Sequence, residues 1–233
     1  MKSLLKTVLL AAFFLPPFLS KADGLAWNSK LAVKGDSLYR AMDLSSEGLS
    51  RKAFQLAWKG YCILRRQGRL ERTDILTICD FSQSSRNKRL YVIDLLNGEL
   101  LKRTYVAHGR NSGTEFARRF SNRPESHQSS LGFYVTGRTY FGEHGLSLRI
   151  RGLEKGFNDR ADKRNIVVHG AGYTSPDFLE NNPFIGRSYG CPAIPELETE
   201  EVIDAIKDGS CLFIYHPTQK YLSGSRILNA RQA

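Results

Sequence analysis

This 233-residue sequence lacks most of the patterns that mark metal, nucleotide and nucleic-acid sites. Its five histidines form neither an HExxH nor an HxH pattern, and no histidine–aspartate cluster has the spacing of metal ligands. No glycine-rich phosphate loop follows a strand-like run, and no RNA- or DNA-binding motif is present. We therefore expect no metal, no cofactor and no nucleic-acid partner.

Cysteine is scarce as well, with four residues and no CxxC pair. An even number of cysteines in an oxidising compartment invites disulfides, although a chain of this length does not need them. Two disulfides, a single Cys62–Cys79 bridge and free thiols all remain open. Cys211 lies in a strand-like run and is expected to be a buried free thiol.

Beyond residue 22 the sequence has no apolar run as long as a membrane span. Residues 1–22 combine two early lysines, an apolar run over residues 8–19 that two prolines interrupt, and the ending Ser20-Lys21-Ala22. This pattern is typical of a secretory signal peptide. The cleavage site has no cysteine, so lipoprotein anchoring is not supported. We expect an exported protein of the periplasm or cell envelope without a stable membrane span.

Acidic residues are fewer than basic ones, 23 against 34, which gives a formal net charge of +11. Removal of residues 1–22 takes away three lysines and lowers this charge to +8. A basic balance attracts anionic polymers, so association with an anionic cell envelope is expected. A general contribution to solubility remains the alternative.

The chain length suits one large domain with a helical appendage. Residues 23–35 are expected to be mobile, and a helical period runs through residues 36–67, where apolar residues recur at spacings of 3, 4 and 3. Ser50 is the predicted N-cap and Gly68 the predicted stop. A second, short helix is predicted over residues 199–207.

After Gly68 short β-rich runs dominate, and Asn97-Gly98 predicts a hairpin. The strands are expected at residues 73–81, 90–95, 101–107, 132–136, 147–150, 165–169 and 211–216. We predict a mainly β fold with α-helices, in which a sandwich- or barrel-like catalytic domain follows a helical N-terminal element. The expected divisions are a signal peptide (1–22), a linker and helical element (23–68), the catalytic domain (69–220) and a C-terminal tail (221–233).

Residues 165–194 carry the clearest chemical signal. A strand-like run delivers His169 at its end, and 22 residues later Cys191 follows in Ser188-Tyr189-Gly190-Cys191-Pro192. A cysteine becomes a strong nucleophile once a nearby base or imidazolium lowers its pKa. Glycine before it permits φ > 0 and a close approach of backbone amides to an oxyanion. The pattern therefore predicts a cysteine–histidine catalytic pair.

These motifs resemble the L,D-transpeptidase catalytic domain, in which a His-Gly strand end precedes Ser-x-Gly-Cys. The similarity is to a divergent branch of that family and covers roughly residues 45–217. It extends over Val106–Gly113, Phe120–Asn122, Ser130–Tyr134, Gly145–Leu148, Val168–Ala171 and Gly186–Pro192. Two positions depart from the better-known branch: Tyr189 stands in place of histidine, and Ala193 in place of arginine.

The resemblance implies an enzyme of peptidoglycan stem peptides. Cys191 would attack the donor carbonyl and His169 would take the thiol proton, while the Gly170 carbonyl orients the imidazole. Ser188 would shape the loop or help to activate the thiol. The backbone amides of residues 189–191, that is Tyr189, Gly190 and Cys191, are the oxyanion candidates.

Two further residues are candidates for substrate binding. Arg187 would bind a substrate carboxylate or remain a solvated charge, and His108 would face the same cleft or cap a strand. Tyr189 is expected to act through its backbone, and an arginine restored at Ala193 to change little. His127 and His144 have no predicted role, and His216 is expected to be structural.

The acyl-enzyme could pass to an amine, which gives a 3→3 cross-link, or to water, which makes the protein an L,D-carboxypeptidase. Another exported cysteine peptidase and a non-catalytic envelope-binding module remain alternatives. In the former class the cysteine usually precedes the histidine, whereas here His169 comes first. Loss of Cys191 or His169 would have favoured the binding module, and both residues are present.

Overall fold

The computed structural model describes residues 29–230. The expected signal peptide over residues 1–22 lies outside this range. The helices are α1 (Ser29–Ala41), α2 (Arg51–Arg66), α3 (Pro176–Glu180), α4 (Thr199–Ile206) and α5 (Gln219–Gly224). The strands are β1 (Ile75–Asp80), β2 (Leu90–Asp94), β3 (Glu99–Thr104), β4 (Gly132–Gly142), β5 (Gly145–Gly152), β6 (Val167–Gly170), β7 (Ala193–Ile194) and β8 (Cys211–Tyr215).

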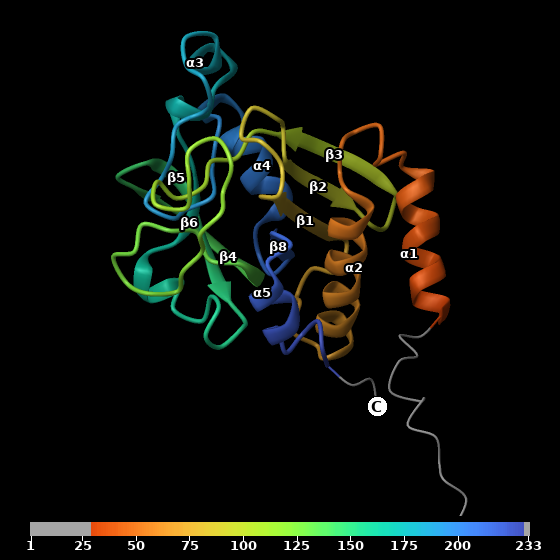
Figure 1. The fold of residues 1–233 in the computed structure, drawn as a ribbon. Coiled ribbons are helices and arrows are strands. Elements are labelled where there is room, and N and C mark those ends of the chain that lie inside the picture. Colours follow the sequence, from red (N-terminus) through yellow and green to blue (C-terminus); the bar gives the residue numbers. More distant parts are fainter. Residues whose placement is uncertain (1–28, 231–233) are drawn as a thin grey trace, which may run out of the picture.

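The N-terminal part forms two helices that lie beside the sheet (Figure 1). Helix α2 begins where predicted, because the Ser50 hydroxyl accepts a hydrogen bond from the Ala53 N–H at 3.1 Å. Gly60 on its buried face touches the ring of Phe133, and a Cβ there would lie 1.9 Å from that ring. The helix therefore needs glycine at this position to approach β4.

Two expectations for this part are corrected. Helix α1 begins at residue 29, inside the segment 23–35 that was expected to be mobile. The periodic stretch 36–67 is two helices rather than one, because the chain turns at Asp43 and Gly48, which both have positive φ.

The strands form one eight-stranded sheet in the order β3-β2-β1-β8-β4-β5-β6-β7. The β1–β8 and β6–β7 pairs are parallel, and the other neighbours are antiparallel. The predicted turn at Asn97-Gly98 joins β2 to β3, with φ +70° at Gly98. The mainly β fold class with N-terminal helices is confirmed.

The two ends of this sheet meet. After β3 the chain returns to β7, where the Ala107 N–H donates to the Ala193 carbonyl at 2.8 Å. Further along, the Ser188 N–H donates to the His108 carbonyl at 3.0 Å, and the Arg110 N–H donates to the Ser188 carbonyl at 2.7 Å. The sheet is thus nearly closed, and its closing seam (residues 107–110 against 188–193) contains the cysteine motif.

Helix α4 contacts β1 and β2 as well as β5 and β6, so it packs inside the curve of the sheet. Its buried side chains are those of Thr199, Val202, Ile203 and Ile206. The segment expected as a C-terminal tail contains part of α5, whose Tyr221 hydroxyl donates to Glu154 Oε2 at 2.8 Å. Within residues 29–230 no helix is both long and apolar enough to cross a membrane.

All four cysteines are free thiols in the structure. Cys79 and Cys211 are buried in β1 and β8, and Cys62 is half-buried on α2. Cys211 therefore has the environment expected from its strand-like sequence. Two disulfides, a Cys62–Cys79 bridge and free thiols were left open, and the structure has free thiols.

Candidate active site

His169 lies at the end of β6, between Ser147 of β5 and Ala193 of β7. Only 3% of its surface is exposed. Its Nδ1–H donates to the carbonyl of Gly170 at 2.8 Å, because a carbonyl oxygen can only accept. This bond fixes the tautomer and leaves Nε2 with a free lone pair, the atom that a general base needs.

The electrostatic surroundings keep this imidazole neutral. Burial lowers the pKa of His169, the hydrogen bond to Gly170 opposes that change, and neighbouring His144 lowers the pKa further. The neutral form therefore dominates at pH 7, above the ordinary value of 6.5.

The loop before Cys191 is held by one serine side chain. The Ser188 hydroxyl donates to the Cys191 carbonyl at 2.6 Å and accepts from the Gly190 N–H at 3.0 Å. Gly190 has φ +124°, and a Cβ there would lie 2.9 Å from the Gln128 carbonyl and 3.1 Å from the Arg164 guanidinium. Ser188 shapes the loop, and glycine is required beside it.

The Cys191 thiol is half-buried against the strand that carries His169. Its Sγ donates to the carbonyl of Asn165 at 3.6 Å and accepts from the Val167 N–H at 3.5 Å. Burial raises the pKa of this thiol, while the Val167 N–H and the charge of Arg164 oppose the change. Sequence reasoning expected a lowered pKa; the site instead rests as a neutral thiol beside a neutral imidazole.

Cys191 and His169 line the same cleft, which has a volume of about 620 Å³. Within residues 29–230 no hydrogen bond joins the two side chains. Arg110, Arg187 and Tyr173 also line this cleft. Burial, with a smaller contribution from Cys191, raises the pKa of Tyr173 to about 12, so its phenol stays protonated.

A second hollow of about 670 Å³ adjoins the first. The two share His144, His169 and Tyr173. The second hollow is lined by the carboxylates of Glu143, Glu196 and Glu200, whereas the cysteine cleft holds two arginines. The catalytic histidine candidate therefore separates a cationic cleft from an anionic one.

His144 was given no role by the sequence, yet its ring stacks on His169. The ring centroids are 4.3 Å apart with an interplanar angle of 20°. His144 lies in the turn between β4 and β5, which pair from Tyr134 to Gly142. The signal that could have found it is Gly142-Glu143-His144-Gly145, a glycine-flanked turn between two strand-like runs.

Two other side chains of the predicted site face the cleft or solvent. Arg187 lines the cleft, and its Nη1 donates to the Gly113 carbonyl at 3.2 Å. Tyr189 is 63% exposed, with its ring 4.5 Å from that of His127 and 5.7 Å from the Arg110 guanidinium. The structure thus brings these residues to the mouth of the cleft.

The structure corrects the expectation that His108 faces the substrate cleft. It is fully buried and does not line the cleft, so it cannot bind substrate there. Its Nδ1 accepts a hydrogen bond from the Arg89 guanidinium at 2.8 Å, and burial lowers the pKa of His108 to about 3. The neutral ring is part of the interior behind the closing seam.

Ala193 and Gly190 also differ from what was expected. Ala193 is fully buried in β7 opposite His169, so an arginine there would place a guanidinium in the core instead of changing little. The Gly190 amide is already bonded to Ser188. Among the described residues, the Tyr189 and Cys191 amides donate no hydrogen bond and remain oxyanion candidates.

Comparison with known proteins gives one match to a protein family. Residues 45–215 match the family model for the L,D-transpeptidase catalytic domain. No curated protein matches the sequence.

Solved structures of L,D-transpeptidases are similar to the chain at low identity. The protein from Mycobacterium smegmatis is 12% identical, with a TM-score of 0.38, over 61% of this chain and 59% of that protein. The protein from Xylanimonas cellulosilytica is 14% identical, with a TM-score of 0.35, over 60% of each chain. The protein from Stackebrandtia nassauensis is 12% identical, with a TM-score of 0.38, over 81% of this chain and 78% of that protein. The chain thus spans about three fifths of the length of the first two.

Proposed function

Since the chain belongs to the L,D-transpeptidase catalytic domain family, we propose that it is a cysteine acyltransferase of peptidoglycan stem peptides in the cell envelope. One observation carries the proposal: a buried imidazole, fixed as its Nδ1–H tautomer by the Gly170 carbonyl, lines the same cleft as the Cys191 thiol. This arrangement supplies a base and a nucleophile without a metal or a cofactor.

In the acylation step, His169 Nε2 takes the thiol proton as Cys191 Sγ attacks the carbonyl of the third stem residue, diaminopimelate. The C–N bond to the terminal D-alanine then breaks, and the imidazolium gives its proton to the departing amine. The product is a thioester on Cys191. Because both groups rest in their neutral forms, the proton passes from the thiol to the imidazole within the reaction and not in the resting enzyme.

The negative charge on the carbonyl oxygen would be held by backbone amides. The free N–H groups of Tyr189 and Cys191 are the proposed donors, since Gly190 N–H is held by Ser188. In the donor cleft, Arg187 and Arg110 would attract the carboxylates of the stem peptide.

In the second step an amine attacks the thioester and His169 accepts a proton from that amine. The C–S bond then breaks, and the imidazolium returns the proton to the departing sulfur, which restores the Cys191 thiol and the neutral base. The carboxylates of the adjoining hollow, at Glu143, Glu196 and Glu200, favour an ammonium-bearing acceptor. We therefore propose cross-linking as the main outcome and hydrolysis by water as the competing one.

The test is incubation of the purified protein with disaccharide-tetrapeptides, followed by mass analysis of the products. A cross-linked dimer is expected. Tripeptide alone would identify an L,D-carboxypeptidase, and unchanged substrate would contradict catalysis and favour an envelope-binding module.

The His144 ring is expected to tune the base. In His144→Ala, His169 loses both a covering ring and a neighbouring imidazole, so its pKa rises toward 6.5. More of the base is then protonated at pH 6, and acylation should fall several-fold more at pH 6 than at pH 8. His144→Phe is the matched control, because it keeps an aromatic ring over His169 and removes only the second imidazole. A loss equal at every pH would contradict this coupling.

Tyr189→Phe should keep acylation within about threefold of the wild-type rate, because the backbone amide survives and a protonated phenol cannot act as a base. Tyr189→Ala should cost more, since it removes the ring that packs on His127 and Arg110. Acylation rates of the three proteins decide the matter. A drop above about tenfold in Tyr189→Phe, or 1.4 kcal/mol, would assign the hydroxyl a role.

A further inference from the structure

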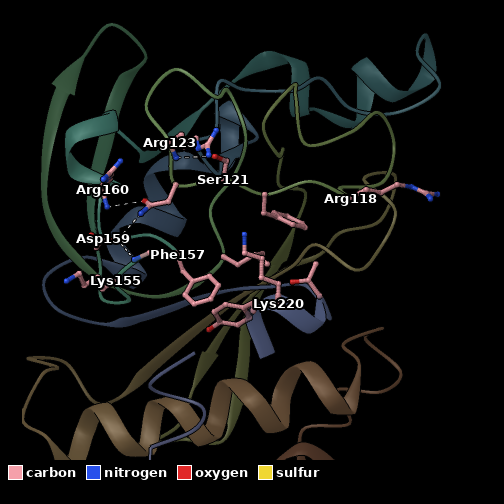
Figure 2. Close-up of a pocket in the computed structure, with 14 residues that line it drawn as sticks. Arg118, Ser121, Arg123, Lys155, Phe157, Asp159, Arg160 and Lys220 are labelled. Atoms are coloured by element: carbon pink, nitrogen blue, oxygen red, sulfur yellow. Dashed lines mark hydrogen bonds between the residues drawn. The ribbon is translucent and has the colours of Figure 1, made fainter. Parts of the chain in front are cut away.

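A third hollow, of about 510 Å³, shares no lining residue with the two clefts at His169. It lies between the loop at residues 118–123, the loop at residues 155–160 and helix α5. Figure 2 shows Arg123 and Arg160 on the two loops and Lys220 on α5 around this hollow. We call it the basic hollow.

The charges of the basic hollow are unbalanced. Five cationic side chains and one carboxylate line it: Arg118, Arg123, Lys155, Arg160, Lys220 and Asp159. Within residues 29–230 none of the five cations lies in an ion pair. Five cations against one carboxylate leave a net charge of +4 on the residues around this concave surface, which produces a positive local potential.

The single carboxylate is already occupied. Asp159 Oδ1 accepts from Asn122 Nδ2 at 2.8 Å and from the Gly156 N–H at 2.6 Å. Asn122 Oδ1 in turn accepts from the Arg160 N–H at 3.1 Å. These bonds join the two loops, so the basic hollow is formed without a ligand.

The floor of the basic hollow is aromatic. Phe157 packs edge-to-face on Tyr221, with ring centroids 5.2 Å apart, and Phe120 packs on His216 at 4.8 Å. Both phenylalanines are half-buried and reach the hollow. A rigid apolar floor below a cationic rim suits a ring with an apolar face and an anionic substituent.

We propose that the basic hollow binds an anionic polysaccharide strand of the cell envelope, with a sugar ring on the aromatic floor and its carboxylate or phosphate among Arg123, Arg160 and Lys220. The choice of a polysaccharide rests on the proposed function, which places the protein at the cell wall. The site would hold the enzyme on the polymer while the cleft at Cys191 acts on stem peptides.

Three soluble probes with one amino-sugar backbone test the charge requirement. Neutral chitotetraose carries no anion, peptide-free peptidoglycan glycan carries lactyl carboxylates, and chitotetraose 6-phosphate carries phosphate. Both anionic probes are expected to bind at least about tenfold more tightly than the neutral one in calorimetry, and to weaken as salt is raised. The tighter of the two identifies the source of the anion.

The variant Arg123→Gln/Arg160→Gln/Lys220→Gln should lose about tenfold or more in affinity for the anionic probes. Its matched control is Lys52→Gln/Arg66→Gln/Arg138→Gln, which removes the same charge from exposed positions outside the hollow. Equal affinity of the neutral and anionic sugars, or equal losses in both variants, would overturn the proposal. So would equally tight binding of oligothymidylate of matched charge, which would indicate a general polyanion surface.

Peptide-free glycan contains no donor for Cys191, so this binding is independent of turnover. Acylation of Cys191 by a carbapenem is measured on the same proteins and should be unchanged in the triple variant. Normal acylation without glycan binding would thus count against the basic hollow alone, whereas absent acylation would count against the proposed acyltransferase function.

Discussion

Cys191→Ala is expected to reduce acyl transfer from disaccharide-tetrapeptides by about 10⁴-fold or more, since loss of a nucleophile removes the covalent pathway altogether. The fold should persist, because Ser188 holds the loop through the Cys191 backbone carbonyl and the Gly190 N–H, and alanine keeps both. The melting temperature of the variant should stay close to that of the wild type.

Intact-mass analysis after treatment with a carbapenem provides the direct readout. The strained lactam acylates a thiol and its leaving group stays attached, so the adduct accumulates. The wild type should gain one adduct and Cys191→Ala none. Cys62→Ala is the matched control, because burial raises the pKa of that half-buried thiol to about 11 and it lies on α2. Equal labelling of wild type and Cys191→Ala would reject the nucleophile assignment.

His169→Ala is expected to slow acylation by about 10²–10⁴-fold, the range of a positioned general base. The pH profile gives the sharper signature. In the wild type, protonation of His169 should reduce acylation only below pH 6.5, because its pKa is lowered. The rate should stay level until the thiol ionises above pH 9, since the pKa of Cys191 is raised.

Without the base, only the thiolate reacts. The residual rate of His169→Ala should therefore rise about tenfold per pH unit from pH 6 to pH 9, in place of the level region. Iodoacetamide alkylation of the same protein provides an independent measure of the thiolate. A variant with the wild-type rate and the same level profile would show that His169 is structural.

Local signals in the sequence predicted a large part of this structure. The Ser50 cap, the Asn97-Gly98 turn and the mainly β class depend on neighbouring residues, and all are present in the structure. The expected proximity of the cysteine motif to the His-Gly strand end came from the family resemblance and not from local signals, and in the structure the two segments pair through β6 and β7.

The remainder depends on contacts between distant segments. Strand β7 has only two residues and exists because Ala193 pairs with His169 and Ala107, which no local pattern encodes. His144 meets His169 because β4 and β5 form a long hairpin, whose outer part lies beyond the strands predicted at residues 132–136 and 147–150. The two roles left open for His108 could not be separated for the same reason, since the contact of its ring with Arg89, the residue before β2, joins segments that are distant in the sequence.

The hydrogen bond from the Cys191 thiol to the Asn165 carbonyl has a consequence for chemical damage. Burial raises the pKa of the Cys191 thiol, and the thiol donates this bond in its protonated form, so the resting enzyme at pH 7 holds a thiol and little thiolate. Peroxide converts thiolates, and not thiols, to sulfenic acid. An enzyme that keeps its sulfur protonated until a substrate reaches His169 would resist oxidative inactivation, and it would lose little of its catalytic sulfur to adventitious electrophiles between turnovers.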